Sequence, residues 1–199
     1  MNTLICFGDS LVSGYGLRKG EGWCELLQRD NSLSKDWKII NKGIPGDTTT
    51  GLLSRSDRDV LKLSPQLVVI LIGTNDLLLG RTVDTVFKNL TFIVSELLSY
   101  DIKPILLTPP GIACEMAEKN WDSSKIYSTV NNNIESLIEM LKGYSIENKI
   151  NVIDLYNGLH ALINHGIITS YKDLYIDGIH LSKKGNIFIA SKVKEIIKV

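Results

Sequence analysis

Cysteine is scarce in this chain of 199 residues, and neither sign of charge dominates it. The three cysteines, Cys6, Cys24 and Cys114, are scattered and joined by no metal-binding spacing, which disfavours both a disulfide scaffold and a zinc site. Lys+Arg and Asp+Glu each total 22, and no basic block indicates binding to nucleic acid or to an anionic membrane. The pattern favours a protein whose cysteines stay reduced and pack as small hydrophobic side chains.

Long apolar segments are missing as well. No apolar run approaches the roughly 18 residues of a membrane-spanning helix, and the N-terminus has no basic stretch followed by a long apolar one. The glycine-rich loops carry no phosphate-binding lysine motif, so we expect neither a metal nor another cofactor. We therefore expect a cytoplasmic protein without integral membrane association, while its oligomeric state stays open.

Short apolar runs, several of them rich in β-branched residues, alternate along the chain with amphipathic segments. Strands are expected at residues 3–7, 38–41, 67–72, 105–107 and 152–155. The run at 67–72 is continuously apolar, as in a central parallel strand that is covered on both faces. The alternation predicts an α/β fold built on a five-stranded parallel sheet, with the whole chain, residues 1–199, forming one domain.

Helices are expected between these strands, where apolar residues recur at helical spacing. They are predicted at about residues 23–27, 47–61, 83–98, 126–141, 157–164 and 183–198. Asp47 is a candidate cap for the second of them. Residues 109–122 are predicted to form a long polar and aromatic loop.

Polar residues and glycines follow the first three expected strands. Ser10 comes after the first strand, Gly43 after the second and Asn75 after the third. Because the carboxyl ends of parallel strands share one edge of a sheet, we expect these three residues to lie close together. Asp177 and His180 precede the last helix and are placed at the same edge.

This set supplies what ester hydrolysis needs: a nucleophile, a base, a group that orients the base, and donors for an oxyanion. Ser10 is the candidate nucleophile and His180 the candidate base, with Asp177 three residues before it. The side-chain amide of Asn75 and the backbone N–H groups of Gly43 and Ser10 are the candidate oxyanion donors. Each of these residues alone is typical of a turn or cap, but their combination on one edge favours a catalytic site.

Other polar residues have structural interpretations. Asp9, Asp47 and Asp76 are interpreted as loop and cap carboxylates. His160 and His165 are interpreted as ordinary histidines, because neither has a carboxylate at a useful spacing before an apolar helix.

The motifs that carry these residues resemble the ordered blocks of the SGNH hydrolases, also called the GDSL esterase/lipase family. They are Gly8-Asp9-Ser10, Asn41-Lys42-Gly43, Gly73-Thr74-Asn75-Asp76 and Asp177-Gly178-Ile179-His180. Residues 43–49 are similar to the branch that holds bacterial acyl-CoA thioesterase I/lysophospholipase L1 enzymes. The resemblance implies a three-layer α/β/α sandwich, a flavodoxin-like strand order and a metal-free Ser-His-Asp mechanism. It assigns Ser10, Asp177 and His180 to catalysis, and Gly43 and Asn75 to the oxyanion hole.

Three functions compete. The first is a serine carboxylic-ester hydrolase acting on small or lipid-like acyl esters, as an esterase, lipase, lysophospholipase or thioesterase. The second is a carbohydrate O-acetyl esterase, and the third is a binding module without turnover; the fold alone does not choose among them. The complete catalytic set argues against the third.

The walls of the pocket should separate the first two functions, and several side chains near the motifs are apolar or aromatic. The candidates for an apolar acyl pocket are Leu77, Leu78, Trp121, Tyr171 and Tyr175. The alternative is that some of them only anchor their loops in the core. The segment at 111–123 is longer than in the thioesterase branch, which leaves the acyl-chain preference open.

Overall fold

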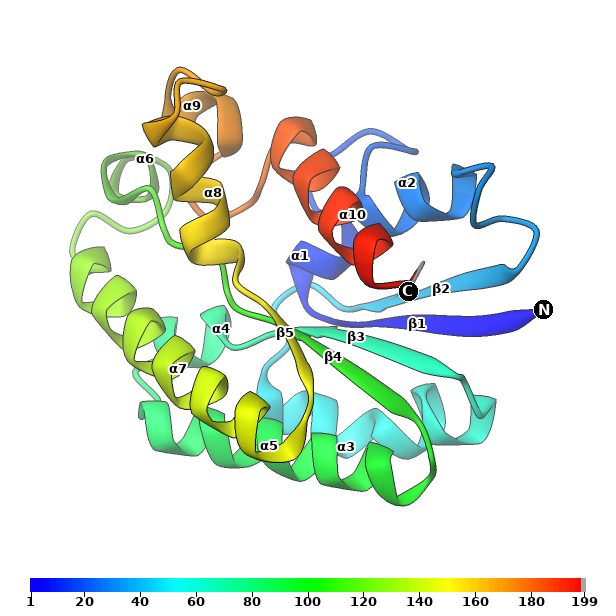
Figure 1. Cartoon of the computed structure of the whole chain (residues 1–199). Coiled ribbons are helices and arrows are strands. Elements are labelled where there is room, and N and C mark those ends of the chain that lie inside the picture. Colours follow the sequence, from blue (N-terminus) through cyan, green and yellow to red (C-terminus); the bar gives the residue numbers. More distant parts are fainter. Residues whose placement is uncertain (198–199) are drawn as a thin grey trace.

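The computed structural model describes residues 1–197 and contains a five-stranded parallel sheet between two layers of helices (Figure 1). The strands are β1 (Asn2–Gly8), β2 (Trp37–Gly43), β3 (Leu67–Leu71), β4 (Lys103–Leu107) and β5 (Asn151–Ile153). They lie in the order β2-β1-β3-β4-β5, and every neighbouring pair is parallel. The predicted α/β sandwich and flavodoxin-like strand order are confirmed.

Alternate residues of the central strands enter two separate cores. In β1, Ile5 and Phe7 pack into one core, whereas Leu4 and Cys6 pack into the other. All of β3 is buried, because helices cover both faces of the sheet at this position. This explains why the strand is a continuous apolar run rather than an alternating one.

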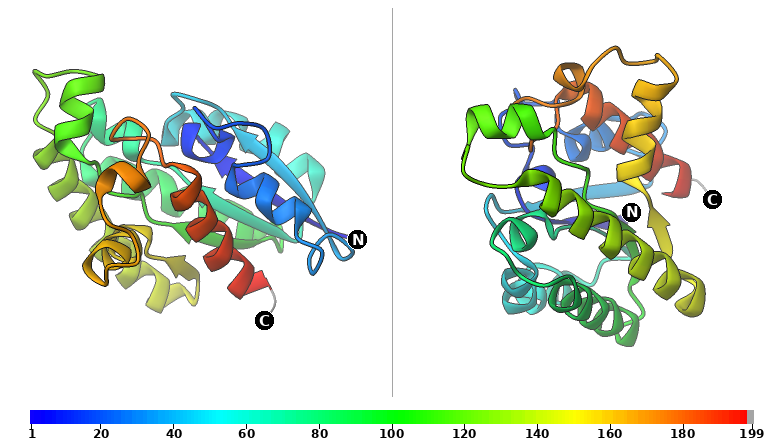
Figure 2. Two further views of the ribbon diagram at one scale, coloured as in Figure 1. Left: turned by 90° about the horizontal axis from the view of Figure 1, so that it is seen from above. Right: turned by 90° about the vertical axis from the view of Figure 1, so that its left-hand side faces the viewer.

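Helices build the two outer layers, which Figure 1 and the right view of Figure 2 show on opposite faces of the sheet. One layer holds α3 (Thr49–Asp59), α5 (Val83–Ser99) and α7 (Tyr127–Asn148). The other holds α2 (Trp23–Arg29), α8 (Leu155–Asn164) and α10 (Lys183–Ile197). The helix predicted over residues 183–198 is therefore present to Ile197, and Lys198 lies outside the described residues.

Short helices near the ends of the strands were not expected from the sequence. They are α1 (Ser10–Ser13), α4 (Thr74–Leu78), α6 (Cys114–Asn120), α9 (Tyr171–Leu174) and the 3-10 turn Leu61–Leu63. The prediction of a loop over residues 109–122 is wrong where α6 lies.

The predicted cap of α3 is also wrong. Thr48, and not Asp47, is the N-cap residue: its hydroxyl accepts the hydrogen bond from the Gly51 N–H. The Asp47 carboxylate instead accepts hydrogen bonds from the Thr48 N–H and from Arg55 Nε. Asp47 is thereby held one residue outside the helix, in a buried ion pair.

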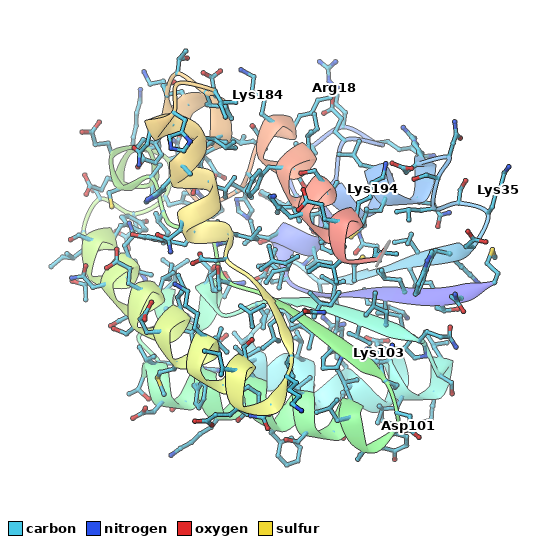
Figure 3. The ribbon with its side chains drawn as sticks, in the orientation of Figure 1. Arg18, Lys35, Asp101, Lys103, Lys184 and Lys194 are labelled. Carbon is cyan, nitrogen blue, oxygen red and sulfur yellow. The ribbon has the colours of Figure 1, made fainter. Side chains whose placement is uncertain are left out.

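Figure 3 shows the side chains as sticks on the ribbon of the sheet and its helices. The labelled cations Arg18, Lys35, Lys103, Lys184 and Lys194 lie on several separate elements rather than in one patch. Within residues 1–197, no helix is long and apolar enough to cross a membrane, and no group of three or more acidic, His or Cys side chains is arranged to hold a metal ion.

Candidate active site

Ser10 stands where β1 turns abruptly into α1 (Figure 1). Strand β1 ends at Gly8, whose position leaves no room for a side chain, because an added Cβ would lie 1.9 Å from the Leu71 carbonyl oxygen. Asp9 caps the short helix that follows, its carboxylate accepting a hydrogen bond of 2.9 Å from the Leu11 N–H. Ser10 therefore occupies the first turn of a helix, where the early N–H groups have no partner inside the helix.

His180 reaches the Ser10 hydroxyl from the far end of the chain. Its Nε2 atom lies 3.0 Å from Ser10 Oγ, and its Nδ1 atom lies 2.8 Å from Asp177 Oδ2. Ser10 and His180 are 6% and 7% exposed, so little water competes for the contact between them. The structure thus brings the three residues predicted for catalysis into one hydrogen-bonded chain.

The loop before α10 fixes the carboxylate of Asp177. This carboxylate also accepts hydrogen bonds from the backbone N–H groups of Ile179 and His180, at 3.0 and 2.8 Å. Burial opposes its ionisation, but the hydrogen bonds from the His180 ring and from the two backbone groups outweigh burial and lower the pKa of Asp177 to about 2. Asp177 is therefore charged at neutral pH and orients the ring of His180.

The predicted oxyanion donors gather around the same turn. Gly43 packs against the backbone of α1, where an added Cβ would lie 2.2 Å from Ser13 N. The Gly43 N–H donates to Asn41 Oδ1 at 2.8 Å. Asn75 Nδ2 donates to the Asp47 carbonyl oxygen at 2.8 Å, and it lies 3.4 Å from Asp9 Oδ2.

Two exposed aromatic rings flank His180. The Tyr15 ring lies 4.4 Å from the imidazole and the Trp121 ring 5.6 Å from it, measured between centroids. Their exposed fractions are 47% and 51%, which is high for large aromatic side chains. Trp121 was expected near the site, whereas Tyr15 was missed, although its place between two glycines just after the nucleophile is a usable signal.

The other residues predicted for the pocket lie elsewhere. Leu77 is buried in the core between α3, α5 and α7, and Leu78 packs against that core. Tyr175 is 2% exposed, and its hydroxyl donates to the Gly111 carbonyl oxygen, so this ring anchors a loop. Tyr171 lines a separate cavity of about 700 Å³ beside His160. The pocket prediction is wrong for the buried side chains Leu77 and Tyr175, because they fill the core.

The two histidines that the sequence analysis interpreted as ordinary do not contact Ser10, Asp177 or His180. His160 lies between the rings of Tyr156 and Tyr171, and burial lowers its pKa. His165 ends α8 and is exposed. His180 is therefore the histidine in contact with Ser10.

Asp9 and Asp76 hold the loops around the turn. Asp76 is fully buried and accepts hydrogen bonds from Thr49 and Arg81. Burial, reinforced by the nearby carboxylates of Asp47 and Asp76, raises the pKa of Asp9 to about 7, although the Leu11 N–H acts in the opposite direction. The site thus contains a buried carboxyl group that titrates near neutral pH.

Comparison with known proteins gives consistent matches. The model of the GDSL-like lipase/acylhydrolase family matches residues 6–186. Esterase TesA of Pseudomonas aeruginosa is 33% identical over 132 residues, which cover 64% of each chain. Thioesterase 1/protease 1/lysophospholipase L1 of Escherichia coli (strain K12) is 30% identical over 106 residues, covering 53% of this chain and 50% of that protein. The matched segments thus span less than two thirds of the lengths of these relatives.

A solved structure, that of the acetyl xylan esterase AlAXEase, matches over nearly the full length of both chains. It covers 98% of this chain and 99% of its own, with a TM-score of 0.77 and 26% sequence identity.

Proposed function

This chain belongs to the GDSL-like lipase/acylhydrolase family, and from that premise we propose that it hydrolyses carboxylic esters with Ser10 as the nucleophile. The observation that carries the proposal is the contact chain from Asp177 through His180 to Ser10 Oγ, with steps of 2.8 and 3.0 Å. Distances of this size let a base take the proton of a hydroxyl as it attacks.

The reaction follows in two halves. Ser10 Oγ attacks the ester carbonyl carbon while His180 Nε2 takes the hydroxyl proton, and Asp177 stabilises the imidazolium that forms. The tetrahedral intermediate collapses when His180 returns the proton to the leaving alcohol, which leaves an acyl group on Ser10. Water then attacks the acyl group in the same way and releases the acid and the free serine.

The negative oxygen of the intermediate is assigned to the N–H groups of Ser10 and Gly43 and to the amide of Asn75. In the structure, Gly43 and Asn75 already donate to acceptors of the protein itself. We propose that the substrate oxygen shares these donors when it arrives. Backbone and amide donors that are already held in place cost little reorganisation during the reaction.

Acyl esters are the proposed substrates. The crevice that touches both Ser10 and His180 has a volume of about 10 Å³, close to the size of a single water, and neither Gly43 nor Asn75 lines it, so its volume selects no acyl-chain length. Ester, thioester and lysophospholipid substrates belong to the same chemistry.

A second candidate, the removal of acetyl groups from sugars, is favoured by the aromatic rings around His180. Exposed rings such as Tyr15 and Trp121 offer flat apolar faces, which suit the apolar faces of a sugar ring. The acetyl xylan esterase among the structural neighbours is consistent with this option.

One experiment tests the proposal and separates the two candidates. Purified protein would be assayed on p-nitrophenyl esters of increasing chain length and on acetylated xylo-oligosaccharides, then labelled with an organophosphate. We expect the p-nitrophenyl esters to be hydrolysed, the label to sit on Ser10, and Ser10→Ala to abolish turnover. Ser54→Ala, which changes an exposed serine whose hydroxyl donates to the Gly51 carbonyl oxygen, is the control. Hydrolysis that survives Ser10→Ala would refute the proposal, and a clear preference for the acetylated sugar would select the second candidate.

The cytoplasmic location, the absence of a required metal and the absence of nucleic-acid partners stay predictions. Cell fractionation, an assay after EDTA treatment and a nucleic-acid binding assay would test each in turn.

A further inference from the structure

Arg55 is a buried cation in the middle of α3, and the catalytic chain of groups does not include it. Its side chain is 6% exposed, and its guanidinium group lies 4.4 Å from the centre of the Phe7 ring. A buried charge is costly unless it is paired and hydrogen-bonded. The contacts of this guanidinium group therefore indicate what it holds in place.

The guanidinium group binds two carbonyl oxygens at the ends of neighbouring strands. Arg55 Nη2 donates to the Gly8 carbonyl oxygen at 2.8 Å, and Nη1 donates to the Lys42 carbonyl oxygen at 3.0 Å. The Lys42 carbonyl belongs to the same peptide group as the Gly43 N–H, one of the proposed oxyanion donors. Because a peptide group is planar, fixing the Lys42 oxygen also fixes the direction of the Gly43 N–H.

The same side chain also reaches the residue that holds the second donor. Arg55 Nε donates to Asp47 Oδ2 at 2.7 Å, and the carbonyl oxygen of Asp47 accepts the hydrogen bond from Asn75 Nδ2 at 2.8 Å. One guanidinium group thus binds both the peptide group that carries the Gly43 N–H and the residue that accepts the hydrogen bond from Asn75. A further hydrogen bond of 3.0 Å, from Nη1 to Asp59 Oδ2, anchors the guanidinium group within α3.

We propose that Arg55 is the positioning residue of the oxyanion hole. It aims the Gly43 N–H and the Asn75 amide at the substrate oxygen, and its positive charge polarises the Lys42–Gly43 peptide group toward donation. This inference rests on the proposed ester hydrolysis and extends it to a residue that does not touch the substrate.

Lysine cannot replace arginine in this role. The planar guanidinium group donates in several fixed directions at once, whereas an ammonium group is a compact charge on a flexible stem. Arg55→Lys therefore keeps the charge but loses simultaneous contact with the Gly8 and Lys42 carbonyls and with Asp47. We expect the donors to remain present but to be poorly aimed.

The test measures kcat and KM of Arg55→Lys on p-nitrophenyl acetate, with folding checked by thermal denaturation. We expect kcat to fall by about 10²-fold, near the loss caused by removing one oxyanion donor, while KM changes little. Arg58→Ala is the matched control: Arg58 lies on the same helix, is 69% exposed and also pairs with Asp59. It should leave kcat unchanged. Arg55→Gln, which removes the buried charge, is the second variant if the lysine does not fold.

A double variant separates positioning from a general structural role. If Arg55 acts through the oxyanion donors, the fold-loss in kcat of the double variant Arg55→Lys/Asn75→Ala should be smaller than the product of the fold-losses of the two single variants. Multiplicative losses, or a folded Arg55 variant with the kcat of the unaltered protein, would overturn the inference. Failure of the proposed function is distinct, because the unaltered protein would then hydrolyse no ester and Ser10 would not react with the organophosphate.

Discussion

Asp9 is a buried carboxyl group one residue before the proposed nucleophile, and its pKa is raised to about 7. A raised pKa means that the folded state binds a proton that the unfolded state has already lost. The contribution of Asp9 to stability is therefore complete below about pH 4 and is lost as pH rises through about 7.

Asp9→Asn mimics the protonated carboxyl and keeps an oxygen that can cap α1. We expect the variant to lose this part of the pH dependence and to be more stable than the unaltered protein at pH 8. Urea unfolding at pH 5, 6.5 and 8 measures the effect, with Asp57→Asn, at an exposed side chain, as the control. If Asp9→Asn is the less stable protein at pH 8, the ionised carboxylate stabilises the folded state and the raised pKa of Asp9 is wrong.

At the scale of single residues, the sequence predicted the positions of the polar groups of the candidate site better than those of the apolar side chains expected to line its pocket. The sequence could propose Ser10, Asp177 and His180 as one group because strand ends and a three-residue spacing place residues without regard to packing; the structure brings the three into contact, and their catalytic roles stay a prediction. Leu77 and Tyr175 were misplaced because an apolar side chain after a motif can face either the core or the solvent. Arg55 was missed since an arginine in an amphipathic helix is usually at the surface, and only its position three residues after the buried Leu52 hints otherwise.

At the scale of elements, the loop before α10 depends on α6. Gly178 has φ +98°, and an added Cβ would lie 2.4 Å from Ala117 N in α6. The chain between Asp177 and His180 can therefore follow its path only with glycine at this position. The Ala113 N–H also donates to the Gly178 carbonyl oxygen at 2.9 Å.

We expect Gly178→Ala to destabilise the protein and to lower kcat, because α6 and the Asp177–His180 loop must move apart. Gly166→Ala is the matched control: it has φ +68° but open space around it, so it should cost only the backbone strain of about 1–2 kcal/mol. Urea unfolding and kcat measure both effects. Equal costs for the two variants, with full activity for Gly178→Ala, would show that the packing on α6 is unimportant.

Among the helices, the long ones were predictable and most of the short ones were not, although the seven-residue α2 was predicted at residues 23–27. The helices α5, α7 and α10 extend over several turns, so their apolar periodicity stands out. The short helices α4, α6 and α9 span at most seven residues, which is too few for a period to show. Such helices are held by tertiary contacts, as α6 is by Gly178, and these contacts are not visible in the sequence.

For the whole molecule, the strand order brings the residues of the candidate site together. The parallel strands β2, β1 and β3 are neighbours, so Gly43, Ser10 and Asn75 arrive together at one edge of the sheet. The sequence predicted this edge from strand ends alone. It also proposed His180, which is 170 residues from Ser10, as the base for that serine, but the distance of 3.0 Å between Nε2 and Oγ depends on the packing of the last loop, which the sequence does not show.

The central claim is that Ser10 and His180 act as one unit, and a double-mutant cycle on p-nitrophenyl acetate tests it most directly. We expect Ser10→Ala and His180→Ala each to reduce kcat to near the background rate, and the double variant to lose little more. His165→Ala, at an exposed histidine, should keep full activity. Losses that multiply in the double variant, or activity that survives His180→Ala but not His165→Ala, would contradict the account.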